Sequence, residues 1–293
     1  MTDFKILDGA MGSELIKRGL TLPRHIWSAE ANIVNPNIVH KIHAEYIDAG
    51  VDYITTNTFR TTPRAYLKTG VSTENAIQMA RDSLLNSVKL AQDASSGSVK
   101  IIASIAPLED CYAPKLFPGP KLAVKEFRQL GKWLSSANVD ILLLETMNST
   151  AETEAGLIAL QNIKRPIWVS FVLNSDCNLL SGDSFVDVLK MIKHYSVDCI
   201  MLNCNPLDRT MIGVEILVDN WSDKWGVYPN LGVGEPSSSG HIIHYEEMVR
   251  FLDIMEKIIY KSPFILGACC GSSPEHIARL CELKLQCYPS YNI

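Results

Sequence analysis

The chain has 293 residues, of which 47% are hydrophobic and 20% charged, so it holds enough apolar material for one large domain core. Its 27 lysines and arginines and 32 aspartates and glutamates give a net charge of −5, which argues against nucleic acid or an anionic membrane as the main partner. No basic-then-apolar leader opens the chain, and no apolar run approaches the ~20 residues that span a bilayer. We therefore expect a cytoplasmic protein whose eight cysteines are thiols or metal ligands and not disulfides.

Short apolar and β-branched segments recur along the chain, and a longer segment with helical spacing follows each one. The predicted strands are, in chain order, 4–8, 51–56, 99–105, 139–144, 167–173, 197–202, 225–228 and 264–266. Eight such units predict an α/β fold, a single-domain (β/α)8 TIM barrel over residues 1–293, since this fold typically takes ~250 residues. An open, doubly wound sheet is the alternative that the same alternation allows.

The segments between the strands carry apolar residues on one helical face, most clearly in 34–49, 74–90 and 245–259. Two of the helix starts carry a capping signal. Asn35 and Ser273 each precede a proline, which predicts a capping side chain followed by proline at the first helical position.

In a (β/α)8 barrel the functional residues lie where the strands end, at the carboxyl face. The candidates that follow the predicted strands are polar or sulfur-bearing: Asp8, Gly9, Thr56, Glu145, Asn203, Cys204, Asn230, Cys269 and Cys270. Because all strands of the barrel are parallel, these side chains are expected to share one rim.

Three of these residues are cysteines, and we expect them to meet. Strands six and eight are separated by one strand, so Cys204 can face Cys269 and Cys270 across the mouth. Three thiolates suit zinc (Zn2+), which in catalytic sites keeps a fourth position open for water or substrate. A free thiol, with a pKa near ~8.5, is mostly protonated at neutral pH, whereas a thiol on zinc is deprotonated. The sequence therefore predicts a zinc site that activates a thiol substrate.

Core packing is the alternative interpretation of these cysteines, because buried cysteine is a common small apolar side chain. Gly267 and Gly271 flank the adjacent pair and favour a backbone that turns tightly around a ligand. Cys177 follows strand five on the same face and stays a minor alternative. The remaining cysteines are predicted to pack in the core or to lie in loops and the tail: Cys111, Cys199, Cys281 and Cys287.

Two further features of the rim carry a functional and a structural interpretation each. Glu145 directly follows the apolar residues 141–144, so its carboxylate either receives an ammonium group or faces solvent and caps the next helix. The segment 8–12 either holds an anion on its backbone N–H groups or is a plain turn.

At these residues the sequence resembles the homocysteine S-methyltransferase family, over nearly the whole chain. The resemblance lies in Asp8-Gly9-Ala10-Met11-Gly12, Ile26-Trp27-Ser28-Ala29, Thr55-Thr56-Asn57-Thr58-Phe59, Leu143-Leu144-Glu145-Thr146, Ser170-Phe171 with Leu180-Ser181-Gly182, Asn203-Cys204, Tyr228-Pro229-Asn230 and Gly267-Ala268-Cys269-Cys270-Gly271. The cysteine triad with its glycine-flanked pair is the specific part. The other segments gain weight from their order.

The resemblance implies an enzyme that transfers a methyl group from a small donor to homocysteine, giving methionine. It implies a catalytic zinc ion on Cys204, Cys269 and Cys270, with the homocysteine sulfur as fourth ligand. Glu145 would hold the substrate amino group and Asn203 would support the zinc loop. The amino-acid end of the substrate would be bordered by Asp8, Gly9 and Thr56.

The chain departs from the family pattern at Ala268, where glycine is usual, and at 231–235, on the donor side. Betaine-using members cage a quaternary ammonium with aromatic residues at positions that here are Arg60 and Thr146. The segment 26–29 resembles the branch that uses S-methylmethionine, whose donor is a sulfonium. The tail that builds tetramers in some relatives is lacking, so we expect a monomer or weak homodimer.

Two other functions fit the same sequence. A metal-free, phosphate-binding TIM-barrel lyase or isomerase would use Gly232 and Gly234 as an anion loop and would tolerate Cys204→Ser. A non-catalytic zinc- or thiol-binding relative would have lost activity through Ala268 and the altered loop. Metal content separates the first alternative from the methyltransferase, and a methyl-transfer assay separates the second.

Overall fold

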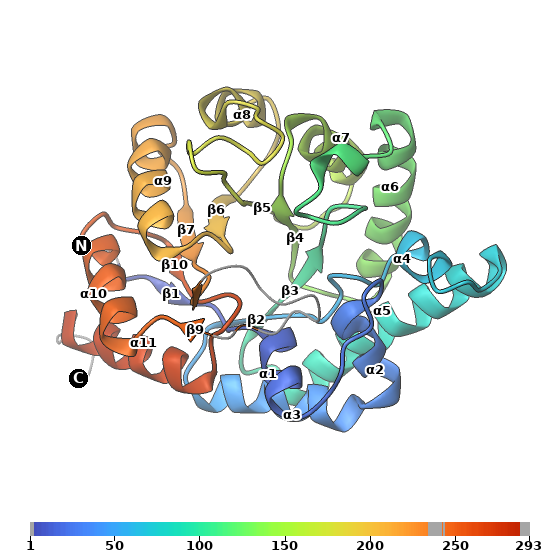
Figure 1. The fold of residues 1–293 in the computed structure, drawn as a ribbon, viewed down its shortest axis with the longest axis horizontal. Helices are drawn as coiled ribbons and strands as arrows, with labels where there is room; N and C mark the ends of the chain where they lie inside the picture. The colour runs from blue at the N-terminus through green and yellow to red at the C-terminus, as the bar shows by residue number, and fades with distance from the viewer. Residues whose placement is uncertain (1–2, 234–241, 243, 288–293) are drawn as a thin grey trace.

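The computed structural model describes residues 3–233, 242 and 244–287, and its centre is a barrel of parallel strands (Figure 1). The eight strands of the barrel sheet are β1 (Lys5–Ile6), β2 (Tyr53–Thr55), β3 (Lys100–Ile105), β4 (Ile141–Met147), β5 (Ile167–Phe171), β6 (Cys199–Asn203), β7 (Trp225–Tyr228) and β10 (Ile265–Leu266). Their order is β1-β10-β7-β6-β5-β4-β3-β2, and a parallel bridge between Leu7 and Tyr53 joins the two ends. The predicted (β/α)8 barrel is confirmed, and the open sheet is wrong.

Helices surround the barrel on its outside (Figure 1). They are α1 (Met11–Lys17), α2 (Ala31–Val34), α3 (Pro36–Asp48), α4 (Pro63–Leu67), α5 (Thr73–Ser95), α6 (Pro120–Ser136), α7 (Thr150–Leu160), α8 (Phe185–Ile192), α9 (Leu207–Asn220), α10 (Met248–Ile259) and α11 (Pro274–Cys287), with 3-10 turns at Trp27–Glu30 and Pro114–Leu116. Within the described ranges, no helix combines the length and the apolar character needed to cross a bilayer.

The helix starts correct two details of the sequence prediction. Asn35 makes no capping hydrogen bond with its side chain, although α3 begins at Pro36 as expected. At the start of α11, Pro274 is the first helical residue as predicted, and the Ser273 hydroxyl lies 2.9 Å from His276 Nδ1. The helix predicted over 245–259 begins at Met248, because Tyr245 pairs with Gly232 in a two-stranded ribbon formed by β8 (Gly232–Val233) and β9 (His244–Tyr245).

The interior of the barrel changes from apolar to polar towards the carboxyl ends of the strands. Ile102, Leu143, Trp168 and Met201 belong to the apolar cluster inside the barrel, together with the fully buried Cys199. Side chains two residues apart on a strand point to the same face. The next inward positions are therefore polar: Ser104, Glu145, Ser170 and Asn203. The predicted packing role of Cys199 is confirmed, and the polar layer marks the face where a site can form.

Candidate metal centre and its polar surroundings

The three predicted cysteines are placed by the end of β7 and the residues directly after it. Cys204 comes directly after β6 and donates its backbone N–H to the Tyr228 carbonyl oxygen at 3.1 Å. Cys269 follows β10 and donates to the Pro229 carbonyl oxygen at 2.7 Å, and Leu231 N donates to the Cys270 carbonyl oxygen at 2.8 Å. β7 lies between β6 and β10 in the sheet, so its end can hydrogen-bond both to Cys204 on one side and to the Cys269–Cys270 segment on the other.

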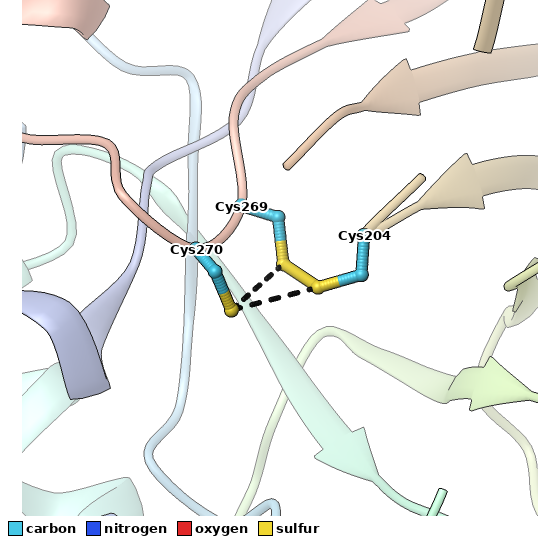
Figure 2. Close-up of side chains that lie close together, drawn as sticks. All are labelled: Cys204, Cys269 and Cys270. Atoms are coloured by element: carbon cyan, nitrogen blue, oxygen red, sulfur yellow. Dashed lines mark hydrogen bonds between the residues drawn. A yellow bond between two sulfur atoms is a disulfide. The ribbon is translucent and has the colours of Figure 1, made fainter. Parts of the chain in front are cut away.

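The structure brings all three sulfur atoms together at the mouth of the barrel (Figure 2). The sulfurs lie within 4.8 Å of one another, with Cys270 Sγ 3.6 Å from Cys204 Sγ and 3.9 Å from Cys269 Sγ. This group of thiols could hold a metal ion. Cys177, the minor alternative, is buried in the loop after β5 and is not a member of this group.

Cys204 and Cys269 are joined as a disulfide, which corrects the prediction that the cysteines form none (Figure 2). Their Cα atoms are 5.5 Å apart, a separation that suits a disulfide. The proximity that lets three thiolates share one ion thus also lets two of them bond to each other. Burial raises the pKa of the Cys270 thiol to about 11, and the negative charge of Glu145 adds to this rise. A positive charge beside the sulfur is therefore needed to form its thiolate at neutral pH.

Two residues of the site hold a left-handed backbone conformation that non-glycine residues rarely adopt. These are Cys204, with φ 53°, and Thr146, with φ 60°. Asn203 joins them, since it precedes Cys204 and donates from Nδ2 to Thr146 Oγ1 at 2.8 Å. Asn203 is fully enclosed, and its Oδ1 has no hydrogen-bond partner among the described residues. The irregular end of β4 and the last residue of β6 are therefore tied to each other.

Glu145 points into the barrel and is held through both carboxylate oxygens. Tyr228 donates to Oε1 at 3.1 Å, and the Ser104 hydroxyl donates to Oε2. Burial raises the pKa of Glu145, while the hydrogen bonds from Ser104 and Tyr228 lower it. The interpretation of Glu145 as a helix cap is wrong, because Ser149 caps α7 by accepting from the backbone N–H of Glu152.

Asp8 is a second carboxylate on the same polar layer. It is buried and accepts from Thr55 N at 2.8 Å and from Thr55 Oγ1 at 3.0 Å. Burial raises the pKa of Asp8 to about 8, and the charge of Glu145 contributes to the rise. Asp8 and Glu145 therefore favour a cation between them or a proton on one of them.

The remaining predicted residues, Gly9 and Thr56, are closely packed, and so is Ala268. A Cβ atom on Gly9 would lie 2.6 Å from Ser272 Oγ and 2.7 Å from the Tyr46 hydroxyl, so only glycine fits there. The Thr56 hydroxyl lies 2.7 Å from that of Thr58, and thus already has a protein partner. The methyl group of Ala268 packs in the core between barrel and helices, on the face opposite to Cys269, which packs against the barrel interior.

The sequence analysis gave several residues of this region no role of their own. Ser170 and Tyr228 were named only as parts of the family segments, and Ser104 was not named. All three could have been assigned to the site, because they occupy the inward positions of their strands. Cys111 was assigned to a loop, yet it is buried, and the charges of both Arg60 and Cys270 act on its thiol, whose pKa burial raises to about 12. No local pattern signals that placement. Of the predicted donor-side segment 231–235, Gly234 and Glu235 lie outside the described residues.

Comparisons with known proteins agree with this architecture. The family model described as homocysteine S-methyltransferase matches residues 5–283. Homocysteine S-methyltransferase 2 of Arabidopsis thaliana is 25% identical over 94% of this chain and 91% of its own length. Homocysteine S-methyltransferase of Escherichia coli (strain K12) is 26% identical over 95% and 94%. The solved structure of homocysteine methyltransferase MmuM from Escherichia coli in its metallated form superposes with a TM-score of 0.83 at 24% identity, over 97% of this chain and 96% of that chain. This structural match shows the fold.

Proposed function

The chain belongs to the homocysteine S-methyltransferase family, and from that premise we propose that it methylates the thiol of homocysteine to give methionine. We further propose that Cys204, Cys269 and Cys270 hold a zinc ion. The observation that carries the proposal is the meeting of three sulfur atoms at the carboxyl face, above a polar layer that contains two carboxylates.

The spacing of the sulfurs supports zinc as the ion. Zinc–sulfur bonds of ~2.3 Å in a tetrahedral site put the sulfurs roughly 3.8 Å apart. The distances of 3.6 and 3.9 Å from Cys270 Sγ to the other two sulfurs fit this value. The Cys204–Cys269 bond must be reduced before these two sulfurs can both bind. When bound, zinc would supply the positive charge that keeps a substrate thiol deprotonated at neutral pH.

The polar layer supports an amino acid as the acceptor substrate. Glu145 and Asp8 give this part of the barrel two carboxyl groups whose pKa values are raised by burial. A bound ammonium group would stabilise the ionised form of both. We propose that Glu145 receives the ammonium, with Asp8, Gly9 and Thr56 bordering the same end of the substrate. Asn203 would not contact the substrate. Its hydrogen bond to Thr146 would instead hold the backbone that presents Cys204.

For the donor we propose S-methylmethionine. Arg60 donates from Nη1 to the Glu109 carbonyl oxygen at 2.6 Å, and its Nη2 lies 4.0 Å from an Asp110 carboxylate oxygen. The hydroxyl of Thr146 is engaged by Asn203. Neither side chain offers the aromatic surface that cages a quaternary ammonium, and the charge of Arg60 is drawn towards the 109–110 loop.

We also propose that residues 1–293 form a single homocysteine-binding domain that acts on small molecules as a monomer or weak homodimer in the cytoplasm. The closed barrel supports one domain, since every one of its strands is hydrogen-bonded into the same sheet. The net charge of −5 supports small-molecule partners over nucleic acid or an anionic membrane surface.

The decisive experiment is a panel of methyl donors tested with homocysteine on reduced, zinc-loaded protein. The panel contains S-methylmethionine, betaine and a methyl folate, and methionine is measured by mass spectrometry. We expect methionine from S-methylmethionine and none without zinc. Zinc binding with no methionine from any donor would favour the non-catalytic relative. A protein that binds no zinc would favour the metal-free lyase or isomerase.

A further inference from the structure

An exposed tyrosine stands directly beside the cysteine pair. Tyr245 in β9 is 52% exposed, and its ring lies over Gly271, the residue that follows Cys270. A Cβ atom on Gly271 would lie 3.0 Å from Tyr245 Cδ1 and 3.1 Å from Cε1. Gly271 also has a φ of 84°, so its backbone favours glycine, and a Cβ atom here would crowd the ring as well. The glycine after the cysteine pair thus makes room for an aromatic ring.

The backbone that carries this ring is tied to the backbone of Cys270. Leu231 donates its backbone N–H to the Cys270 carbonyl oxygen at 2.8 Å, and Glu246 N donates to the Leu231 carbonyl oxygen at 2.8 Å. Tyr245 itself pairs with Gly232 across the β8–β9 ribbon. Because this ribbon leaves the carboxyl end of β7, it stands on the face of the barrel where the three sulfurs meet.

A methyl donor must approach the acceptor sulfur from this open face. In the displacement, an electron pair of the homocysteine thiolate forms the new sulfur–carbon bond while the donor's bond to the same methyl carbon breaks. The electrons of the broken bond stay on the donor sulfur, so a sulfonium leaves as a neutral thioether. The donor is therefore cationic before the reaction and neutral after it, and a group that binds its charge acts mainly on binding.

The aromatic neighbour of Arg60 already has a cation beside it. The Arg60 guanidinium lies over the Phe59 ring, 5.4 Å from its centroid, so its positive charge disfavours a second cation there. Tyr245 keeps half of its surface open to solvent. An open aromatic face attracts a cation within about 6 Å of the ring centroid.

We propose that Tyr245 is a specificity-determining residue for the methyl donor, whose ring binds the onium group of a sulfonium donor beside Cys270. This inference rests on the proposed methyl transfer. It explains how the chain selects a cationic donor although the positions used by betaine-dependent relatives are Arg60 and Thr146.

The test compares Tyr245→Leu with Tyr245→Phe, which keeps the ring. Tyr260→Leu is the matched control: this tyrosine is 60% exposed, and it lies between α10 and β10, at the opposite end of the barrel. On zinc-loaded protein, Tyr245→Leu should raise the KM for S-methylmethionine roughly 3- to 30-fold, the range that one cation–π contact gives. The KM for homocysteine, the zinc content and the kinetics of the other two variants should stay near those of the unaltered protein.

A second measurement does not depend on turnover. Calorimetric titration with tetramethylammonium should show binding that is weakened in Tyr245→Leu and kept in Tyr245→Phe. Should the unaltered protein make no methionine from any donor, the proposed function fails, while this titration still decides the role of the ring. The inference is overturned by an unchanged donor KM in Tyr245→Leu, by a lack of tetramethylammonium binding to the unaltered protein, or by methyl transfer from uncharged donors alone.

Discussion

The hydroxyl of Tyr228 donates a hydrogen bond to Glu145 Oε1 at 3.1 Å, across 83 residues of sequence. The same hydroxyl lies 2.7 Å from Ser170 Oγ, and Ser170 Oγ accepts from the backbone N–H of Thr146 at 3.1 Å. The Glu145 carboxylate is thus oriented by a chain of hydrogen bonds. The chain begins at the backbone of Thr146 and passes through Ser170 in β5 and Tyr228 in β7. This arrangement presents one negative charge in a fixed direction beneath the cysteine group.

Replacing Glu145 with Gln should weaken homocysteine binding. The substitution keeps the size of the side chain but removes the charge that would pair with the ammonium, and a hydrogen bond to a charged group is worth about 1.5–3 kcal/mol. The KM for homocysteine should therefore rise about 10- to 150-fold, with a smaller change in kcat. Tyr228→Phe is the control that keeps the charge, and it should raise this KM less. An unchanged KM in Glu145→Gln would contradict the role proposed for the carboxylate.

Replacing Cys204 or Cys270 with Ala should abolish zinc binding and turnover while leaving the barrel folded. Each substitution removes one of three proposed ligands without removing a large core side chain. Zinc is measured by elemental analysis of the purified protein, and folding by circular dichroism. Cys287→Ala, in α11, is the control and should bind zinc like the unaltered protein. Stoichiometric zinc in either of the first two variants would count heavily against the assignment.

Oxidation should inactivate the protein reversibly. Cys204 and Cys269 can form a disulfide, and two sulfurs bonded to each other cannot both bind a metal ion as thiolates. After mild oxidant, peptide mapping should show a Cys204–Cys269 crosslink together with loss of zinc and activity. Reductant and zinc should restore both, whereas either one alone should not. Full activity in crosslinked protein, or after prolonged chelation, would refute this expectation.

The stability of the protein should fall as pH rises from about 4 to about 8 because of Asp8. Its pKa is raised from 3.8 in the unfolded chain to about 8 in the folded protein, so the folded state holds a proton that the unfolded state has lost over this range. The free energy of unfolding then decreases with pH, here by an amount on the order of a few kcal/mol.

Urea unfolding at pH 5 and pH 8 measures this effect, and Asp8→Asn is the comparison. The amide does not titrate, so the variant should lose less stability between the two pH values than the unaltered protein does. Equal losses would show that Asp8 does not carry the pH dependence.

Much of the fold was predictable because the signal for it is local. The alternation of short apolar strands with helices of 3.6-residue spacing placed all eight strands of the barrel. The strand ends were less well predicted: β1 contains Lys5–Ile6 where residues 4–8 were expected. Asp8 lies beyond the end of β1, although its backbone N–H still donates to the Tyr53 carbonyl oxygen at 3.1 Å. Its carboxylate accepts from Thr55, and no local pattern in residues 4–8 signals that contact.

By itself, the sequence determined which residue types reach the carboxyl face, including Glu145 and the three cysteines, and which family the chain resembles. Only the tertiary structure decided that Cys204 and Cys269 can bond to each other, that Tyr228 orients Glu145, and that Tyr245 covers Gly271. The physical reason is the range of the interactions. Strand periodicity is a property of neighbouring residues, whereas these contacts depend on the closure of the barrel and on turns such as that at Cys204. The backbone there is left-handed, and its N–H donates to the Tyr228 carbonyl oxygen at the end of β7.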